Sequence, residues 1–257
     1  MKISIIGAGN VATNLALAFK KAGHEIVQIY NRSDDAGQEL ARTLAASFTS
    51  DINQLSDADI YLLAVKDDAI EERATQLKVN GKIVAHTSGT KSKNLLASSS
   101  ENFGIFYPLQ TMKKSSKVDF KSVPVLIEGS NEATAAVLEM LAKTISQNVH
   151  KVDEAQRQWI HVAAVFANNF TNHLFSISEN MLVNRGLSFE ILKPLIFSFI
   201  QNLQTSSPSE IQTGPAVRGD NKTIEQHLLL LADDTHLQKI YEILTDSILA
   251  SASQNHK

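Results

Sequence analysis

The hydrophobic pattern divides the chain into two unlike halves. In the first half, short apolar runs rich in β-branched residues alternate with amphipathic segments, which is typical of βαβ units around a buried parallel sheet. Helices are expected in the gaps between the runs. The runs predict strands at Lys2–Ile6, Glu25–Tyr30, Ile60–Val65, Lys82–His86, Gly104–Tyr107 and Val123–Ile127.

The second half is predicted to be helical. Strand signals stop near Glu132, and after Asp153 an apolar repeat of helical period continues towards the C-terminus. A glycine-rich loop, QTGPAVRGDNKT at Gln212–Thr223, interrupts this repeat. We therefore expect an α/β protein, with a Rossmann-type doubly wound parallel sheet over residues 1–150 and an all-α domain over residues 151–257.

Composition and charge exclude several classes of protein. With 257 residues, of which 43% are hydrophobic, the chain can bury a substantial core. A net charge of −3 offers no positive field for nucleic acid or an anionic membrane. The absence of cysteine excludes disulfides, thiol nucleophiles and cysteine-ligated metals. Because no signal peptide and no apolar run of about 18 residues is recognised, we expect a cytoplasmic protein that acts on a small molecule and holds no metal.

The clearest motif lies at the N-terminus, between the first predicted strand and the helix after it. Gly7, Gly9 and Ala12 form G-x-G-x-x-A in the context that dinucleotide binding requires. Gly7 allows the tight turn, Gly9 lets a pyrophosphate approach the backbone, and Ala12 lets the helix pack closely. Free N–H groups at the helix start, which includes Asn10 and Val11, would face the phosphates. The alternative is a merely tight strand-to-helix turn.

The end of the second strand favours NADP over NAD. An NAD site usually places an acidic residue there to bind the ribose hydroxyls. This chain has Asn31, Arg32 and Ser33 instead. Arg32 can form charge-assisted bonds to a 2′-phosphate, with Asn31 and Ser33 as further donors. Asp34 and Asp35 just beyond keep NAD as the alternative.

Two further loops should meet the cofactor, because ligands of open α/β sheets bind beyond the carboxyl ends of the strands. Ala64, Val65 and Lys66 would lie along the cofactor. In the next loop, a hydroxyl and exposed N–H groups could contact the substrate or the nicotinamide, although a plain turn explains the same residues. The residues of this loop are Thr87, Ser88 and Gly89, and His86 before them is interpreted as structural.

A long helix predicted over residues 152–183 carries two contrasting faces. One is an apolar stripe that predicts a core face. The other holds imidazole and amide groups rather than the lysines and glutamates of a solvated face, which favours a semi-buried cleft. The stripe is Trp159, Ala163, Phe166, Phe170, Leu174, Ile177 and Met181. The polar face is Glu154, Arg157, His161, Asn168 and Asn172.

Several of these segments resemble known families. The stretches GAGNVA, NRS, LLAVKDDAI and VAHTSG are similar to the Rossmann domain of pyrroline-5-carboxylate reductases, deazaflavin-dependent NADP oxidoreductases and β-hydroxyacid dehydrogenases. GIFYPLQT and TGPAVRGD resemble a family of NADP oxidoreductases in which that domain precedes its own helical domain. The resemblance covers essentially the whole chain. It implies a nicotinamide cofactor and homodimerisation through the helices, but no particular substrate.

The resemblance also suggests a catalytic pair. In the β-hydroxyacid dehydrogenase group, the helix that opens the second domain commonly supplies a lysine and an asparagine, one as proton donor and the other as an orienting amide. His161 and Asn168 look like the corresponding pair, although the lysine is absent and the interval is longer. Asn172, one turn further on, and Ser88 would contact the substrate. The alternative is a histidine that pairs with asparagines in a helix interface.

The glycine-rich loop adds a cation. Asp220 or Asn221 is placed to cap the following helix, and such a cap accounts for the aspartate alone. Arg218 could clamp a carboxylate or phosphate of the substrate, or pair with Asp220. The tripeptide Arg218, Gly219, Asp220 is not interpreted as an adhesion signal, because nothing in the chain indicates export.

These observations predict an NADP(H)-dependent oxidoreductase. It would transfer hydride to or from a carbonyl or imine of a small, anionic metabolite at the interface of the two domains. The alternative is a non-catalytic NADP-binding sensor or assembly protein of the same fold.

Overall fold

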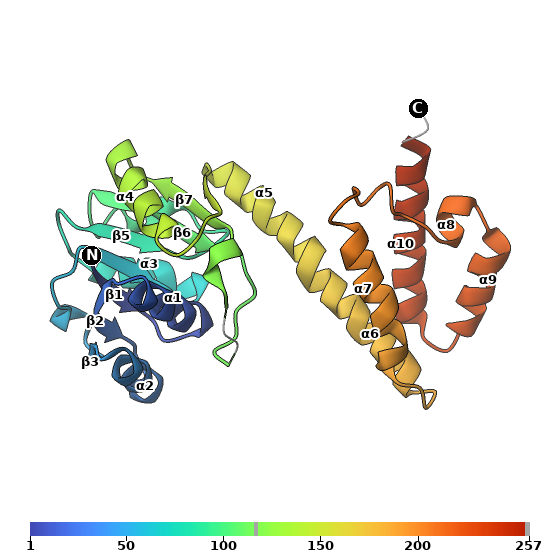
Figure 1. Cartoon of the computed structure of the whole chain (residues 1–257), viewed down its shortest axis with the longest axis horizontal. Coiled ribbons are helices and arrows are strands. Elements are labelled where there is room, and N and C mark those ends of the chain that lie inside the picture. Colours follow the sequence, from blue (N-terminus) through green and yellow to red (C-terminus); the bar gives the residue numbers. More distant parts are fainter. Residues whose placement is uncertain (116–117, 255–257) are drawn as a thin grey trace. The chain divides into compact units, whose positions relative to one another are not determined.

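The computed structural model describes residues 1–115 and 118–254 and divides into two compact units, Met1–His173 and Leu174–Lys257 (Figure 1). A helical stretch begins with α5 (Glu154–Ala164), shortly after the domain boundary expected at residue 150. The compact units divide later, between His173 and Leu174 inside this stretch. Residues 151–173 therefore belong to the first unit.

The described strands of the first unit form an eight-stranded sheet in the order β3-β2-β1-β4-β5-β6-β7-β8. All neighbours pair in parallel except β6 and β7, which are antiparallel, so the predicted doubly wound parallel sheet is confirmed and carries one antiparallel pair. The strands are β1 (Lys2–Ile6), β2 (Glu25–Tyr30), β3 (Ser47–Thr49), β4 (Ile60–Leu63), β5 (Ile83–His86), β6 (Asn102–Pro108), β7 (Val125–Gly129) and β8 (Val149–Lys151).

Two strands were missed from the sequence. β3 and β8 have three residues each and lie at the two edges of the sheet. A segment of three residues is too short to show an alternation of apolar and polar positions. The expectation that strand signals stop near Glu132 is therefore wrong, because β8 follows α4 (Glu132–Lys143) and pairs with β7.

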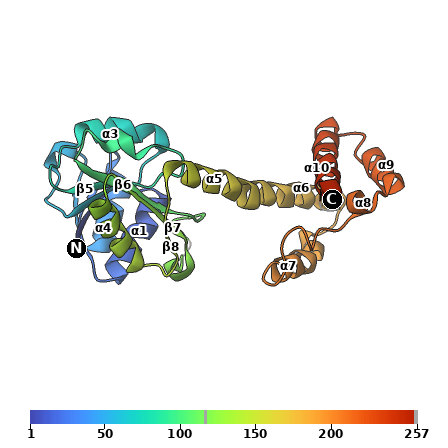
Figure 2. The same ribbon diagram turned by 90° about the horizontal axis from the view of Figure 1, so that it is seen from above.

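Helices cover both faces of the sheet. In β1, Ile3 and Ile5 point into one core and Ile6 into the other, as the period of two in a strand requires. The first core includes residues of α1, α2 and α4, and the second includes residues of α3 and a short 3-10 turn, η3. Figure 2 shows α3 on one side of the strands and α1 and α4 on the other. These elements are α1 (Asn10–Lys21), α2 (Asp34–Leu44), α3 (Ile70–Gln76), η3 (Lys93–Leu96) and α4 (Glu132–Lys143).

The register of the parallel strands brings their carboxyl ends to one edge. Ile6 pairs with Leu63, and Leu63 with His86. β6 runs parallel to β5 and ends at Pro108, three residues beyond the partner of His86. The glycine loop after β1 and the loops after β4, β5 and β6 therefore emerge side by side. This edge is where the fold positions a ligand.

The second unit is helical, as predicted, but has almost no core of its own. Among its described residues to position 252, Ala216 is the one buried side chain. Large apolar side chains are exposed on each of its longer helices, for example Leu195, Leu229 and Ile243 at 69%, 75% and 68%. Its helices are α6 (Thr171–Val183), η6 (Phe189–Leu192), α7 (Lys193–Asn202), α8 (Pro215–Arg218), α9 (Asn221–Leu230) and α10 (Thr235–Gln254).

The apolar stripe predicted on the long helix is likewise not covered by this chain. Trp159, Phe166 and Phe170 are 74%, 64% and 50% exposed, so the expectation of a core face is wrong for the single chain. No helix among the residues described is both long and apolar enough to cross a bilayer.

The glycine-rich loop contains a short helix rather than an irregular connection. α8 is bounded by Gly214 and Gly219, whose φ angles of 115° and 66° favour glycine. The predicted cap is confirmed at Asp220, whose carboxylate accepts the Thr223 N–H at 3.1 Å and its hydroxyl at 2.7 Å. These two hydrogen bonds lower the pKa of Asp220, with smaller help from Arg218.

Candidate functional site

The glycine loop has the form that a dinucleotide site requires. Gly7 has a φ of 118°, and a Cβ atom there would lie 2.4 Å from the carbonyl oxygen of Ala64. Gly9 precedes α1 in an extended conformation, and a Cβ atom there would meet nothing within 4 Å. Ala12, on the first turn of α1, is fully buried. Open space therefore lies directly at the start of α1, where free N–H groups could receive a pyrophosphate.

The segment after β6 packs against the start of α1, which the sequence did not indicate. The Lys114 N–H donates to Oδ1 of Asn10 at 3.1 Å. The amide of Asn14, which is buried, donates to the carbonyl oxygens of Asn10 at 2.9 Å and Lys113 at 3.2 Å. A buried asparagine four residues after Asn10 is the one signal that could have predicted this contact.

The end of β2 presents an unpartnered cation. Asn31 donates from its amide to the carbonyl oxygen of Ser33 at 2.7 Å, which holds the turn. Arg32 and Ser33 are exposed, and their side chains form no hydrogen bond or ion pair within residues 1–115 and 118–254. The guanidinium of Arg32 is therefore available to an anion.

The loops after β4 and β5 are joined by one carboxylate. Asp67, which follows Lys66 in the loop after β4, accepts the hydroxyls of Ser88 and Thr90, each at 2.8 Å. The Ser88 oxygen also accepts the N–H groups of Thr90 and Lys91, each at 3.1 Å. This buried hydroxyl has thus committed its proton and both acceptor positions to the loop. A substrate contact through Ser88 stays a prediction and would require one of these bonds to break.

His86 has the geometry of a structural histidine, in agreement with its interpretation from the sequence. Its Nδ1 accepts the Ser88 N–H at 3.1 Å, and its Nε2 donates to the Ser92 carbonyl at 3.2 Å. Burial lowers the pKa of His86 to about 4. The imidazole is therefore uncharged at neutral pH. The following residue, Thr87, donates from its backbone to the Leu63 carbonyl at 3.2 Å.

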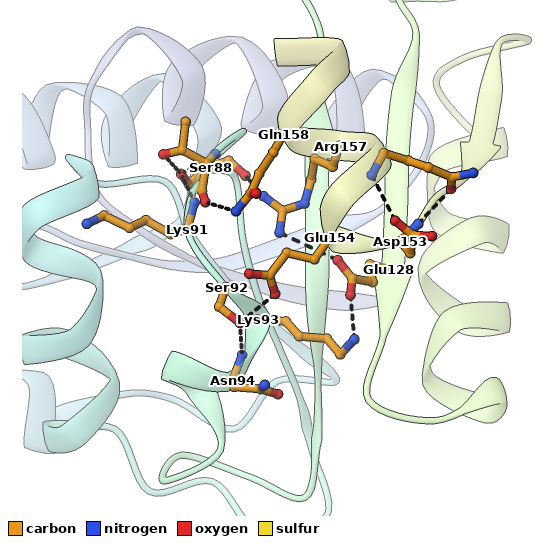
Figure 3. Close-up of polar contacts among 12 residues, drawn as sticks. Ser88, Lys91, Ser92, Lys93, Asn94, Glu128, Asp153, Glu154, Arg157 and Gln158 are labelled. Carbon is orange, nitrogen blue, oxygen red and sulfur yellow. Dashed lines mark hydrogen bonds and ion pairs between the residues drawn. The ribbon is translucent and has the colours of Figure 1, made fainter. Parts of the chain in front are cut away.

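A buried arginine ties α5 to the loop after β5 (Figure 3). Arg157 is completely buried. Its Nη1 donates to the Ser88 carbonyl at 3.2 Å, and its Nη2 lies 3.5 Å from Oε2 of Glu128 on β7. That approach is an ion pair without a hydrogen bond, because neither atom has a hydrogen-bond partner. Glu128 forms a closer ion pair with Lys93.

Other contacts reinforce the start of α5. The helix begins with a capping box, in which Asp153 and Gln156 each satisfy the other's backbone N–H. Ser92 donates to the carboxylate of Glu154 at 2.7 Å, and Gln158 donates to the Thr90 carbonyl at 3.1 Å. The first turns of α5 are thereby held against residues 88–93. The sequence placed Glu154 and Arg157 on one polar face but did not show what they bind.

This attachment brings His161 to the predicted substrate loop. His161 lies one turn beyond Arg157, and its Nδ1 is 2.9 Å from the hydroxyl of Tyr107 near the end of β6. A Cβ atom on Gly89 would lie 2.5 Å from His161 Nδ1 and 2.9 Å from Tyr107 Cζ. His161 and Gly89, predicted separately, are therefore brought together. Tyr107 was predicted as the last residue of a strand, but not as part of the site.

Asn168 occupies a π-helical segment, η5 (Val165–Phe170). Its amide donates to the Thr111 hydroxyl at 2.8 Å, and Thr111 belongs to the segment that also contacts α1. A π turn has more residues than an α turn. The polar residues before and after it therefore do not lie on one face in the way that an uninterrupted α-helix would place them. Asn172, on α6, is exposed and stays a predicted contact.

Arg218 belongs to the second unit. Its side chain is exposed at the end of α8, and its role as a clamp stays a prediction. In the same unit, His227 shares a hydrogen bond of 2.8 Å with Tyr241. The residues described contain no group of three or more histidine, aspartate and glutamate side chains that could hold a metal ion.

The comparisons with known proteins agree with this fold. Residues 2–88 match a family described as NADP oxidoreductase coenzyme F420-dependent, and residues 123–248 match a domain of unknown function, DUF2520. A solved structure named "putative NADP oxidoreductase", from Bacteroides fragilis, is 38% identical, covers 97% of this chain and 98% of its own, and has a TM-score of 0.89. No curated protein matches the chain in sequence.

More distant structures share the fold alone. A 1-pyrroline-5-carboxylate reductase from Streptococcus pyogenes is 18% identical, with 99% of this chain and 98% of that chain covered and a TM-score of 0.65. An imine reductase from Myxococcus stipitatus in complex with NADP⁺ is 16% identical, with 99% and 93% covered and a TM-score of 0.65.

Replacing Arg157 by methionine should destabilise the first unit by about 3–5 kcal/mol, because Glu128 would lose a buried partner and the Ser88 carbonyl a donor. Urea unfolding measures this loss. The double variant Arg157→Met, Glu128→Gln should lose less than the sum of the single changes. Arg185→Met removes an exposed arginine as a control and should change stability by under about 0.5 kcal/mol. A similar small change at Arg157 would contradict its anchoring role.

Proposed function

Because the chain belongs to the family of NADP oxidoreductases whose nucleotide-binding domain precedes this domain of unknown function, we propose that it is an NADP(H)-dependent reductase of a carbonyl or imine group in a small, anionic metabolite. The observation that carries the proposal is the position of His161. This imidazole lies against Gly89 at the carboxyl edge of the sheet, the edge that also presents the glycine loop. A proton donor and a dinucleotide site would thus share one edge.

The residues present fit the cofactor. The open space at Gly9 and the N–H groups of Asn10 and Val11 at the start of α1 suit a pyrophosphate. Arg32 suits the 2′-phosphate that distinguishes NADP from NAD, since its guanidinium is exposed and has no partner in the described chain. The loop of Ala64, Val65 and Lys66 would border the cofactor. When bound, the nicotinamide supplies or accepts the reducing equivalents.

The chain's own residues would handle the substrate. His161 is half-buried, and an imidazole is a common proton donor at neutral pH. It would protonate the carbonyl oxygen or imine nitrogen as that atom gains negative charge. The exposed amide of Asn168, held by Thr111, would orient the substrate. The loop at Thr87 and Gly89 would provide backbone contacts.

The proposed preference for an anionic substrate rests on Arg218. This exposed guanidinium belongs to the last residue of the short helix α8, between Gly214 and Gly219. Planar guanidinium groups bind carboxylate and phosphate with two hydrogen bonds. Asp220 is already engaged as a helix cap, so its carboxylate does not neutralise Arg218 by a direct ion pair.

The proposal includes a homodimer formed through the second unit. A helical unit with one buried described residue cannot stabilise itself by burial of its own apolar surface. The exposed side chains extend over α7, α9 and α10, which is more apolar surface than monomeric proteins usually present. A second copy would cover this surface with the same side chains.

Cofactor preference tests the proposed role of Arg32. The wild-type protein should bind NADPH more tightly than NADH, and Arg32→Ala should weaken NADPH binding by roughly 10- to 150-fold through the loss of about 1.5–3 kcal/mol of charged hydrogen bonds. NADH binding should change little. The control variant Arg42→Ala removes an exposed arginine on α2 and should leave both affinities unchanged. Fluorescence titration measures them, and a wild-type preference for NADH would exclude this role for Arg32.

A metabolite screen tests the reductase activity. We expect the wild-type protein to oxidise NADPH with at least one carboxylate- or phosphate-bearing carbonyl or imine compound. His161→Ala should lower kcat by about 10²- to 10⁴-fold, because it removes the proton donor, while NADPH affinity stays unchanged. NADPH binding without turnover of any such compound would instead support a non-catalytic NADP-binding protein.

The oligomeric state tests the proposed partner. Sedimentation of the wild-type protein should show a dimer. Ile243→Glu on α10 should raise the dimer dissociation constant at least about tenfold, because burial of a large aliphatic side chain contributes about 1.5–3 kcal/mol. Glu242→Gln changes the neighbouring exposed residue and should not affect assembly. A wild-type monomer at micromolar concentration would contradict the proposal.

A further inference from the structure

The hydrogen bond between Tyr107 and His161 joins two rigid parts of the first unit. Tyr107 is held in β6, where it pairs with Leu126 of β7. His161 is held on α5, one turn beyond the buried Arg157. The Tyr107 hydroxyl and His161 Nδ1 are 2.9 Å apart, and the two ring centroids are 5.9 Å apart. The contact therefore has a fixed geometry that neither side chain sets alone.

The backbone of the predicted substrate loop passes directly over this contact. A Cβ atom on Gly89 would come within 2.5 Å of His161 Nδ1 and 2.9 Å of Tyr107 Cζ. Real Cβ atoms do not approach other atoms so closely, so a larger residue would force the loop or one of the two rings to shift. The absence of a side chain at position 89 thus preserves the contact beneath the loop.

The direction of this hydrogen bond depends on the tautomer of His161. Burial, and then the charge of Asp67, raise the pKa of the Tyr107 hydroxyl, while the charge of Arg157 opposes them. The hydroxyl therefore keeps its proton at neutral pH, and within the described chain His161 Nδ1 is its one hydrogen-bond partner. A neutral imidazole that accepts at Nδ1 carries its hydrogen on Nε2.

The other ring nitrogen is left for a ligand. His161 Nε2 forms no hydrogen bond with any part of the chain that the structure describes, and the side chain is partly exposed. His86, the histidine that precedes the same loop, uses both of its ring nitrogens for backbone contacts. The two histidines thus differ in what they can offer to a substrate.

We propose that Tyr107 is a positioning residue that holds His161 in the Nε2–H form and replaces the proton that His161 gives away. This inference rests on the proposed reductase function and specifies how its proton is delivered. When the Nε2–H bond breaks and a bond forms to the substrate oxygen or nitrogen, Nδ1 takes the Tyr107 hydroxyl proton. The imidazole stays neutral, and the tyrosinate takes a proton from water.

Nitrogen NMR of protein labelled in its histidine rings tests the tautomer without any substrate. In the wild-type protein at pH 8, His161 should show a protonated Nε2 and a hydrogen-bonded, unprotonated Nδ1. Tyr107→Phe keeps the ring but removes the donor, so the His161 signals should move towards a mixture of both tautomers. Unchanged His161 signals in this variant, or a protonated Nδ1 in the wild-type protein, would overturn the proposal.

Kinetics with a substrate found by the screen test the proton replacement. Tyr107→Phe should lower kcat about tenfold or more, with NADPH affinity unchanged. The matched control is Tyr241→Phe, which breaks the other tyrosine–histidine contact, with His227, in the second unit. It should change the His227 signals and leave kcat unaltered. A kcat equal to that of the wild type in Tyr107→Phe would overturn the replacement step.

The two proposals can fail separately. If the wild-type protein reduces no carbonyl or imine, the reductase function fails, and the inference fails with it as a description of proton delivery, although the NMR result still decides the tautomer. If turnover depends on His161 while the tautomer does not depend on Tyr107, the reductase function stands and the inference alone is wrong.

Discussion

The buried guanidinium of Arg157 is the contact on which the candidate site depends. A charge without solvent must have partners, and Arg157 finds them in the Ser88 carbonyl and Glu128, which belong to the loop after β5 and to β7. Because α5 is attached at this point, the next turn of the helix carries His161 to Tyr107 and Gly89. A helix docked by apolar contacts alone could slide by a turn, whereas a buried ion pair permits one position.

The loops at the site support each other through groups that have little capacity left. Ser88, His86 and Asp67 commit their polar atoms to neighbouring backbone and side chains. Their hydrogen bonds tie the loop to its neighbours, and the groups proposed to meet ligands are instead His161 Nε2, the Asn168 side chain and the N–H groups at the start of α1. Preorganisation of this kind places reacting groups without cost at the moment of reaction. A hydroxyl close to the site, such as that of Ser88, can therefore have a structural role.

The two units differ in how they reach stability. The first has a sheet with a core on each face. The second has large exposed apolar side chains and one buried described residue, so its helices need a surface from outside the unit. The proposed second copy would supply that surface. The apolar stripe on the long helix, of which Trp159 and Phe166 are exposed, has the same requirement. An amphipathic pattern shows that a face will be covered, but not by which chain.

The sequence by itself determined the Rossmann fold, the helical second unit and the glycine loop, because these depend on local patterns: the period of apolar residues, and glycines between a strand and a helix. β3 and β8 were not predicted, because three residues are too few to show a period. The π-helical segment was not predicted, because its apolar spacing resembles that of an ordinary helix. Only the tertiary structure decided that Arg157 is buried, that Ser88 braces its loop and that Tyr107 meets His161. The contacts of Arg157 with Ser88 and of Tyr107 with His161 join residues 69 and 54 positions apart. Nothing local in a chain records which distant side chain will satisfy a buried charge or a ring nitrogen.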